Sequence, residues 1–347
     1  RGGLGLHAGA KRLRVRDGDT GGGSAGGDGT ARDGGPGGLR SVGQLFLGLS
    51  ATGKTTLTCH GLGLSGSERA ELVQDDVCAL LPDGTVAGSE GGGLYIKTQG
   101  LSPDEQPELY RAATSEGAVL ENVVVEPDGA VDFDDDSITS NGRASVRRDD
   151  LPGAAEGIDL EALDHVFFIT RNRLMPPVSR LSPGEAAAAF MLGESIQTSA
   201  GDPDRAGESI RVVGTNPFVV GSPGEEGNRF LDLVRETGVE CFLLNTGEVG
   251  YGEPRSVGVE ESTAILEAIA RDAIEWAPDD RLGVELPTRV RGVDVDAFYP
   301  PALVPDFDER LADLLAERRA YLEGFPDLDD EIFETALSGP IDRARTE

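Results

Sequence analysis

Apolar and polar positions along the chain follow strand-like and helix-like spacings in turn, which is the pattern of an α/β protein. Residues 11–16 alternate cationic and apolar side chains with the period of two that a half-buried strand requires. Residues 182–192 begin with Ser-Pro-Gly-Glu, a helix start, and continue with strong helix formers. Short apolar runs bounded by turn residues predict further strands at 44–47, 70–73, 120–125, 165–170, 211–213, 217–220 and 240–244, and helical spacing predicts helices at 55–59, 261–276 and 306–321.

One segment has no apolar side chains to bury. Residues 17–38 contain 11 glycines in 22 positions, with Ser, Asp and Pro among them, so we expect a flexible loop. Residues 22–26 spell Gly-Gly-Ser-Ala-Gly, which matches the G-x-S-x-G of a nucleophile elbow. That motif needs a strand before it and a helix after it, and neither is predicted here. We therefore interpret the segment as a linker.

The net charge of the chain excludes some classes of binding partner. The chain has 62 Asp plus Glu against 31 Lys plus Arg, a net charge of −31, which excludes nucleic acid and anionic membranes as expected partners. No apolar run approaches the roughly 18 residues of a membrane-spanning helix. Only three of the cationic residues are lysines, and an acidic, lysine-poor surface is typical of proteins that stay soluble in concentrated salt. We expect a halophilic, cytoplasmic protein, as a monomer or small homo-oligomer.

The cysteines and the start of the chain add two expectations. Cys59, Cys78 and Cys241 form neither a disulfide framework nor a C-x-x-C metal motif, which favours a reducing compartment. The chain begins with Arg1 rather than Met and shows no signal-peptide pattern, so we expect it to be a fragment of a longer protein.

The most specific motif is a phosphate loop. Residues 48–55 read Gly-Leu-Ser-Ala-Thr-Gly-Lys-Thr, which fits G-x-x-x-x-G-K-[ST]. Its glycines let the backbone curl so that successive N–H groups point at phosphate oxygens. Lys54 adds a positive charge beside the phosphates, and the Thr55 hydroxyl can ligate a metal that bridges them. With a strand predicted before it and a helix after it, the motif predicts that the chain binds a nucleoside triphosphate.

Three other places are candidates for metal or phosphate binding. Asp75-Asp76 follows the loop at the end of an apolar stretch, where a carboxylate can hold a metal that faces the phosphates. Acidic pairs recur elsewhere in this chain. The metal-site prediction therefore depends on the position of this pair just after the loop and a strand, not on the pair alone. Taken alone, Lys97 is a candidate for reaching a phosphate or an adenine edge, and His7 for binding a metal.

These motifs together resemble the ATP-dependent phosphoenolpyruvate carboxykinases. The phosphate loop is similar to the first kinase motif of that family and Asp75-Asp76 to the second. Six further segments match in the family's order, at residues 92–98, 120–123, 132–135, 141–143, 174–181 and 244–247. The resemblance covers most of residues 43–280. It implies an α/β fold with a carboxykinase-type P-loop nucleotide-binding domain on a mixed sheet and a small C-terminal helical or lid region.

The resemblance also implies an organisation and a set of residue roles. We expect a strand-containing segment at 1–16, the flexible insertion at 17–40, the nucleotide- and metal-binding domain at 41–285 and a helical extension at 286–347. The implied catalytic residues are Lys54, Arg143 and Asp76, and the implied metal ligands are His7, Asp76 and Thr55. The implied nucleotide contacts are Gly48, Leu49, Ser50, Ala51, Thr52, Gly53, Lys54, Thr55, Thr56, Lys97, Arg143, Arg255, Ser256 and Ser262.

The implied reaction converts oxaloacetate and ATP into phosphoenolpyruvate, CO2 and ADP, with Mg2+ on the nucleotide and Mn2+ at His7 and Asp76. The chain departs from the family in four ways. Nothing matches the large N-terminal domain, Ala51 replaces a loop glycine, and Lys11 follows His7 where the family's ligand lysine precedes it. The Asn-Gly-Arg at 141–143 also differs at its middle residue from the commoner Asn-Thr-Arg. Two alternatives therefore stay open: a regulatory nucleotide-binding module without turnover, and a P-loop protein serine kinase of the bacterial type.

Overall fold

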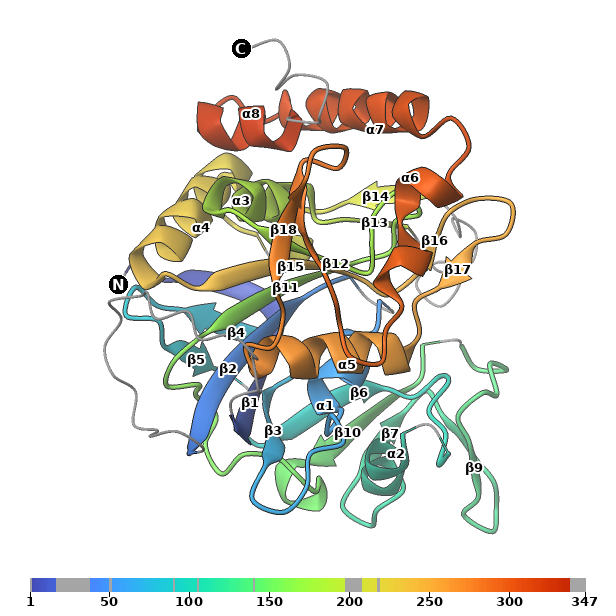
Figure 1. The fold of residues 1–347 in the computed structure, drawn as a ribbon. Helices are drawn as coiled ribbons and strands as arrows, with labels where there is room; N and C mark the ends of the chain where they lie inside the picture. The colour runs from blue at the N-terminus through green and yellow to red at the C-terminus, as the bar shows by residue number, and fades with distance from the viewer. Residues whose placement is uncertain are drawn as a thin grey trace.

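A computed structural model describes residues 2–16, 38–49, 52–89, 91–104, 106–139, 141–196, 208–216 and 219–337. It confirms the mixed α/β fold. A large sheet crosses the middle of the molecule with helices on both faces, and a smaller lobe lies beside it (Figure 1). The sequence predicted the insertion at 17–40, and residues 17–37 lie outside the described part of the chain, as does the G-x-S-x-G match.

The main sheet has ten strands in the order β18-β19-β12-β15-β11-β2-β1-β4-β5, with β3 also paired to β1. Its strands are β1 (Leu4–Arg16), β2 (Leu39–Leu47), β3 (Arg69–Gln74), β4 (Val77–Leu80), β5 (Val86–Gly88), β11 (His165–Thr170), β12 (Val178–Leu181), β15 (Glu240–Asn245), β18 (Trp276–Asp279) and β19 (Val284–Pro287). β2, β11 and β15 run parallel, and their neighbours β1 and β12 run antiparallel to them. The three parallel strands therefore end at one edge of the sheet, where the phosphate loop begins.

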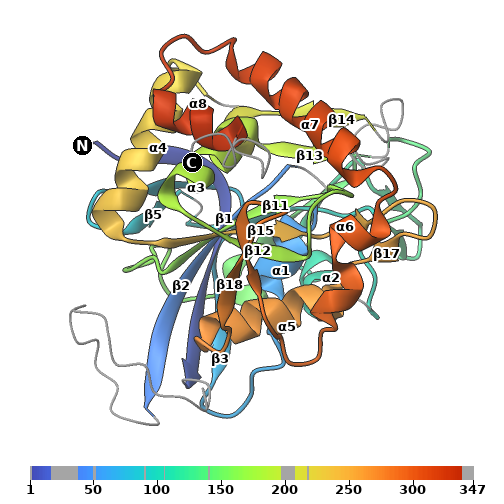
Figure 2. The same cartoon turned by 45° about the horizontal axis from the view of Figure 1, so that its top comes forward.

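Helices cover both faces of this sheet, which is why every residue of β11 is buried. One face carries α3 (Pro183–Leu192), α4 (Pro223–Thr237), α7 (Phe307–Leu322) and α8 (Asp330–Leu337), and Figure 2 shows α7 and α8 lying outside α3. The other face carries α1 (Lys54–Cys59) and α5 (Val259–Ala270). The short α6 (Pro300–Leu303) leads into α7.

The smaller lobe is built on a three-stranded sheet with its own apolar core. Its strands are β6 (Gly93–Lys97), β10 (Arg143–Arg147) and β7 (Val119–Glu121), and α2 (Pro107–Ala113) packs on one face. The remaining elements are the hairpins β8 (Val124–Val125) with β9 (Val131–Asp132), β13 (Glu194–Ile196) with β14 (Ser209–Arg211) and β16 (Glu248–Val249) with β17 (Arg255–Ser256), and 3₁₀ turns at Arg148–Asp150, Val213–Thr215 and Val295–Phe298.

Four element predictions were wrong in part. The strand expected at 120–125 is interrupted at Asn122, whose φ of 58° turns the chain between β7 and β8. The helix expected at 261–276 ends at Ala270, and Trp276 already belongs to β18. The strand expected at 211–213 ends at Arg211. Of the strand expected at 217–220, residues 217–218 lie outside the described part, and the other two are not in a strand, because Val220 is 96% exposed and packs against nothing.

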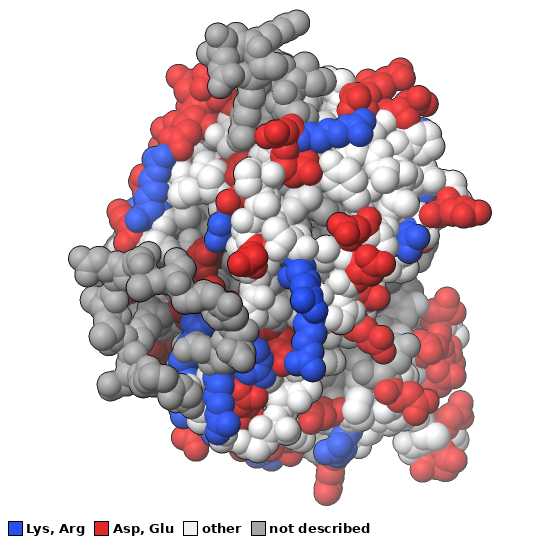
Figure 3. Space-filling view, in the orientation of Figure 1, with Lys and Arg blue, Asp and Glu red and all other residues white. Residues whose placement is uncertain are grey.

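Two further observations bear on the surface. None of the helices in the part of the chain that the structure describes is long and apolar enough to cross a membrane. On the face seen in Figure 3, carboxylates are spread widely and cationic side chains are fewer, as the net charge of −31 requires.

Candidate active site

The phosphate loop connects the end of β2 to the start of α1. Gly53 has a φ of 99°, which an L side chain would resist, and it directly precedes Lys54, the first residue of the helix. A Cβ at Gly48 would lie 2.7 Å from Thr52 Oγ1, so the loop closes too tightly there for any side chain. Thr52 Oγ1 donates to the Leu49 carbonyl at 2.8 Å. Ser50 and Ala51 lie outside the described residues.

Three side chains meet beside this loop: His7 from β1, Lys54 from α1 and Asp76 from the link between β3 and β4. Lys54 Nζ lies 2.8 Å from His7 Nε2 and 3.3 Å from Asp76 Oδ1. His7 Nε2 lies 2.8 Å from the same Asp76 oxygen. The Lys54 side chain is 9% exposed and that of Asp76 is 46% exposed, so the cluster opens to solvent on the carboxylate side. The structure thus brings together three residues that the sequence assigned to one site.

Strand pairing explains why Asp76 reaches this position. β1 pairs with β3 through its second half and with β4 through its first, and Asp75-Asp76 is the link between those two strands. The Ala8 N–H donates to the Asp76 carbonyl at 2.8 Å, which fixes the link against β1 one residue after His7. The carboxylate and the imidazole are therefore neighbours because two adjacent strands place them side by side.

The electrostatics of the cluster favour an ionised carboxylate. The hydrogen bond from His7 and the nearby Lys54 ammonium lower the pKa of Asp76 to about 2, although partial burial opposes this shift. His7 Nδ1 lies 2.7 Å from the Thr215 carbonyl, so Nδ1 carries a proton and Nε2 is turned toward Lys54 and Asp76. In the neutral imidazole Nε2 accepts from Lys54, and in the imidazolium it donates to Asp76.

The donor chemistry of His7 and Asp76 fits the expected divalent metal. An imidazole nitrogen and a carboxylate oxygen both suit Mn2+, and a histidine whose other ring nitrogen donates to a backbone carbonyl is the common arrangement in metal sites. Within the described ranges, no group of three or more His, Cys, Asp or Glu side chains is arranged to hold a metal. His7 and Asp76 could therefore supply two ligands of such a site but not a complete set.

Thr55, the third expected metal ligand, contacts Asp75, the other member of the acidic pair. Its hydroxyl donates to Asp75 Oδ2 at 3.3 Å, and Asp75 is only 4% exposed. Asp75 and Asp76 thus have different partners: the buried carboxylate bonds to the loop threonine and the more exposed one bonds to His7 and Lys54.

A second connection runs from the loop to the segment expected at the adenine. Thr246 Oγ1 donates to the Thr52 carbonyl at 2.8 Å, and the Val257 N–H donates to the Gly247 carbonyl at 2.8 Å. Arg255 and Ser256 lie on β17 just before Val257, and both are exposed. Ser262 is buried in the first turn of α5, where its hydroxyl donates to the Gly258 carbonyl at 2.9 Å.

Lys97 and Arg143 form a second cationic cluster, on the small lobe. They are directly opposite each other on β6 and β10, and Arg143 is in turn opposite Glu121 on β7, so all three share one face of the sheet. Tyr95 lies on the same face and donates to Glu121. Partial burial and the neighbouring Arg143 charge lower the pKa of Lys97 below its ordinary value.

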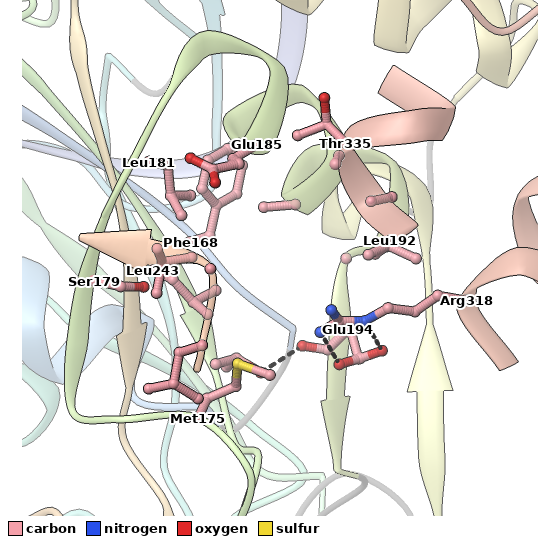
Figure 4. A pocket seen from close by; sticks show the side chains of 18 of the residues that line it. Phe168, Met175, Ser179, Leu181, Glu185, Leu192, Glu194, Leu243, Arg318 and Thr335 are labelled. Carbon is pink, nitrogen blue, oxygen red and sulfur yellow. Dashed lines mark hydrogen bonds and ion pairs between the residues drawn. The ribbon is translucent and has the colours of Figure 1, made fainter. Parts of the chain in front are cut away.

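A hollow of about 110 Å³ lies elsewhere, between the main sheet and the helices α3, α7 and α8. Apolar side chains such as Phe168, Leu192 and Leu243 surround it, and the ion pair between Glu194 and Arg318, at 2.9 Å, lies at one end (Figure 4). Because these two charges neutralise each other and the rest of the lining is largely apolar, we do not assign this hollow to phosphate binding.

The sequence analysis missed the contacts that three residues make around the phosphate loop. Thr215 orients His7, Thr246 holds the loop carbonyl, and Lys11 donates to the end of α1. Thr215 and Thr246 are ordinary threonines more than 190 positions from the residues they contact, so no local pattern signals them. The sequence motif around residues 244–247 marked the position of Thr246 but not its contact.

Comparison with known proteins agrees with the resemblance drawn from the motifs. The family model of phosphoenolpyruvate carboxykinase matches residues 31–296. A phosphoenolpyruvate carboxykinase (ATP) of Aeropyrum pernix is 37% identical over 328 residues, which is 93% of this chain and 61% of that protein. Those of Mesorhizobium japonicum and Azorhizobium caulinodans are 31% and 33% identical, over 84% and 82% of this chain and 55% and 54% of theirs. The chain thus spans between half and two thirds of the length of these relatives.

Proposed function

Because this chain belongs to the phosphoenolpyruvate carboxykinase family, we propose that it carries the nucleotide- and metal-binding part of an enzyme that converts oxaloacetate and ATP into phosphoenolpyruvate, CO2 and ADP. The cluster of Lys54, His7 and Asp76 beside the phosphate loop is the observation that carries this proposal. It joins a phosphate-binding cation to a histidine–carboxylate pair of the kind that holds a divalent metal.

The reaction has two stages that the cluster can assist, a decarboxylation and a phosphoryl transfer. Loss of CO2 breaks a carbon–carbon bond of oxaloacetate and leaves the electron pair on an enolate. The enolate oxygen attacks the γ-phosphorus of ATP in line, the bond to ADP breaks, and phosphoenolpyruvate forms. A divalent metal at His7 and Asp76 would stabilise negative charge on the enolate oxygen.

The residues of the chain have separate tasks in this scheme. Lys54 offsets the charge that develops on the transferred phosphoryl group, and the loop N–H groups hold the phosphates of the magnesium nucleotide, with Thr55 beside them. Thr215 keeps the His7 ring turned so that Nε2 faces the reacting groups. Lys97 and Arg143 bind the γ-phosphate and the organic acid, and Arg255, Ser256 and Ser262 contact the nucleoside.

The proposal extends to the surroundings of the enzyme. Its ligands are small molecules and it takes neither nucleic acid nor membrane, in keeping with the net charge of −31. We place it in a salt-rich cytoplasm, as a monomer or small homo-oligomer, and retain Mg2+ and Mn2+ as its metals.

The experiment is oxaloacetate-dependent ADP formation in concentrated salt with ATP, Mg2+ and Mn2+. It is run on this chain and on the longer protein if the coding sequence extends upstream. We expect MgATP binding by this chain and turnover by the protein that contains it. Nucleotide binding without turnover in either protein would favour the regulatory module. Phosphate transfer to a protein hydroxyl, with no dependence on oxaloacetate, would favour the serine kinase.

A further inference from the structure

Lys11 is buried completely, which is unusual for a lysine. Its Nζ donates to the Leu57 carbonyl and, at 2.6 Å, to the His60 carbonyl, and it lies 5.8 Å from the centre of the Phe46 ring. Leu57 belongs to the last turn of α1 and His60 is its C-cap. The ammonium group therefore sits at the carbonyl end of the helix, where a positive charge interacts favourably with the helix dipole.

One face of β1 holds both ends of this helix. His7, Gly9 and Lys11 alternate along the strand and so point to the same side. His7 meets Lys54 at the start of α1, and a Cβ at Gly9 would lie 2.5 Å from the hydroxyl of Thr58, so the middle of the helix packs directly on the strand. Lys11 completes the contact at the other end.

Burying this amine opposes folding, so its presence calls for a reason. Desolvation lowers the pKa of Lys11 from 10.5 to about 7, and the folded protein therefore binds its proton less readily than the unfolded chain does. An apolar side chain would fill the same space between β1 and α1 without that penalty. It would leave the two carbonyls at the end of α1 without this donor. Residues that oppose stability in this way cluster where function needs a fixed geometry.

We propose that Lys11 is a positioning residue for the phosphate site: by holding the carbonyl end of α1 against β1, its ammonium group fixes where Lys54 and Thr55 stand beside the loop. The helix has only six residues, so a displacement of its last turn is transmitted to its first. The proposal rests on the proposed function only in its expectation about nucleotide affinity.

The test uses the fact that the chain has only three lysines. With lysine labelled at Cε with ¹³C, the side-chain signals of Lys11, Lys54 and Lys97 are read separately by NMR. Lys11→Met removes the donors and keeps the length of the stem. Gln44→Met is the matched control, because Gln44 is directly opposite Lys11 on β2, is equally buried, and among the described residues has no hydrogen-bond partner for its amide atoms.

In Lys11→Met we expect the Lys54 signal to move or broaden and the Kd for MgATP to rise about tenfold or more. In Gln44→Met we expect the Lys54 signal to stay and the Kd to change less than twofold. A folded Lys11→Met with an unchanged Lys54 signal and unchanged affinity would overturn the proposal. So would equal effects in both variants, since these would indicate a general response of the core.

If Lys11→Met does not fold, Lys11→Gln, which keeps an amide donor on a shorter stem, is measured by the same two readouts. It should still displace the Lys54 signal and raise the Kd for MgATP, because the shorter stem cannot reach both the Leu57 and the His60 carbonyl; an unchanged signal with unchanged affinity would again overturn the proposal. Absence of MgATP binding by the unaltered chain would contradict the proposed function and leave the NMR comparison intact.

Discussion

The two cationic groups assigned to the active site are built in opposite ways. Lys54 is nearly buried and contacts a histidine and a carboxylate within 3.3 Å, on a helix that β1 holds at both ends. Lys97 and Arg143 instead stand side by side, each partly buried, on the small sheet, where burial and the Arg143 charge together lower the pKa of Lys97. The first group is organised by the protein itself. In the second, two like charges are brought together, an arrangement that an anionic ligand would relieve.

Under the proposed function, this difference predicts different tasks for the two groups. A preorganised cation with fixed partners stabilises charge that develops during the reaction without rearranging. Adjacent, partly exposed cations attract a ligand that is already negative, such as a carboxylate or a phosphate. We therefore expect phosphoryl transfer to depend most on Lys54, and binding of the γ-phosphate and the organic acid to depend on Lys97 and Arg143.

The largest expected effect comes from removing the preorganised cation. We expect Lys54→Met to reduce oxaloacetate-dependent ADP formation by about 10³-fold or more, because it removes the cation that the phosphate loop itself supplies to offset charge on the transferred phosphoryl group. The measurement is kcat in the protein that shows turnover, with thermal unfolding to check that the fold is kept. Activity within a few-fold of the parent would show that Lys54 does not assist phosphoryl transfer, and the difference in role between Lys54 and Lys97 would then be wrong.

The second prediction concerns the unfolding free energy that is lost by burying Lys11 at the end of α1. Lys11 has a folded pKa of about 7 against 10.5 for the free side chain, so between these pH values the unfolded chain binds more protons and stability rises with pH. The full change in unfolding free energy across this range is on the order of 5 kcal/mol. We expect the difference in unfolding free energy between the parent and Lys11→Met to grow in the parent's favour from pH 7 to 10.5.

Chemical denaturation at a series of pH values measures that difference, and subtracting the variant removes the titration of the other groups. Gln44→Met, which changes no titratable group, should follow the parent at every pH. A constant difference between the parent and Lys11→Met would contradict the burial of a titrating amine at this position.

The smallest expected effect tests the interaction between Lys97 and Arg143. Arg143→Gln should raise the pKa of Lys97 toward its ordinary value, because it removes the positive charge next to that amine while the partial burial stays. Titration of the Lys97 Cε signal gives the value directly. Arg255→Gln, a similar loss of charge on a different strand, should leave the Lys97 titration where it is. An unchanged Lys97 in Arg143→Gln would show that the two side chains do not interact.

The sequence predicted the parts of this site that are local and missed those that depend on packing. The loop, its strand and its helix lie within 21 consecutive residues, from Leu39 to Cys59, and their spacing identifies them. Nothing near Thr215 indicates that its carbonyl accepts from His7, since the two are 208 positions apart. Periodicity likewise did not show where a run ends: Asn122 and Asp272, at positive φ, divide segments that looked continuous.

A repeated tetrapeptide illustrates the same limit. Ser-Pro-Gly-Glu occurs at 182–185 and again at 222–225, and each begins a helix. The first was predicted and forms a full capping box between Ser182 and Glu185. The second was not predicted, and the side chain of Ser222 donates to Asp327 instead of accepting from its own helix. The same tetrapeptide thus begins two helices with different contacts, one local and one tertiary.

The bond between His7 and Thr215 has a consequence for the order in which the protein acquires its site. During synthesis the residue that sets the direction of the His7 ring emerges 208 positions after His7 itself. Contacts so distant in sequence form late in folding. A nascent chain therefore contains the whole phosphate-loop motif long before Thr215 can orient the histidine beside it.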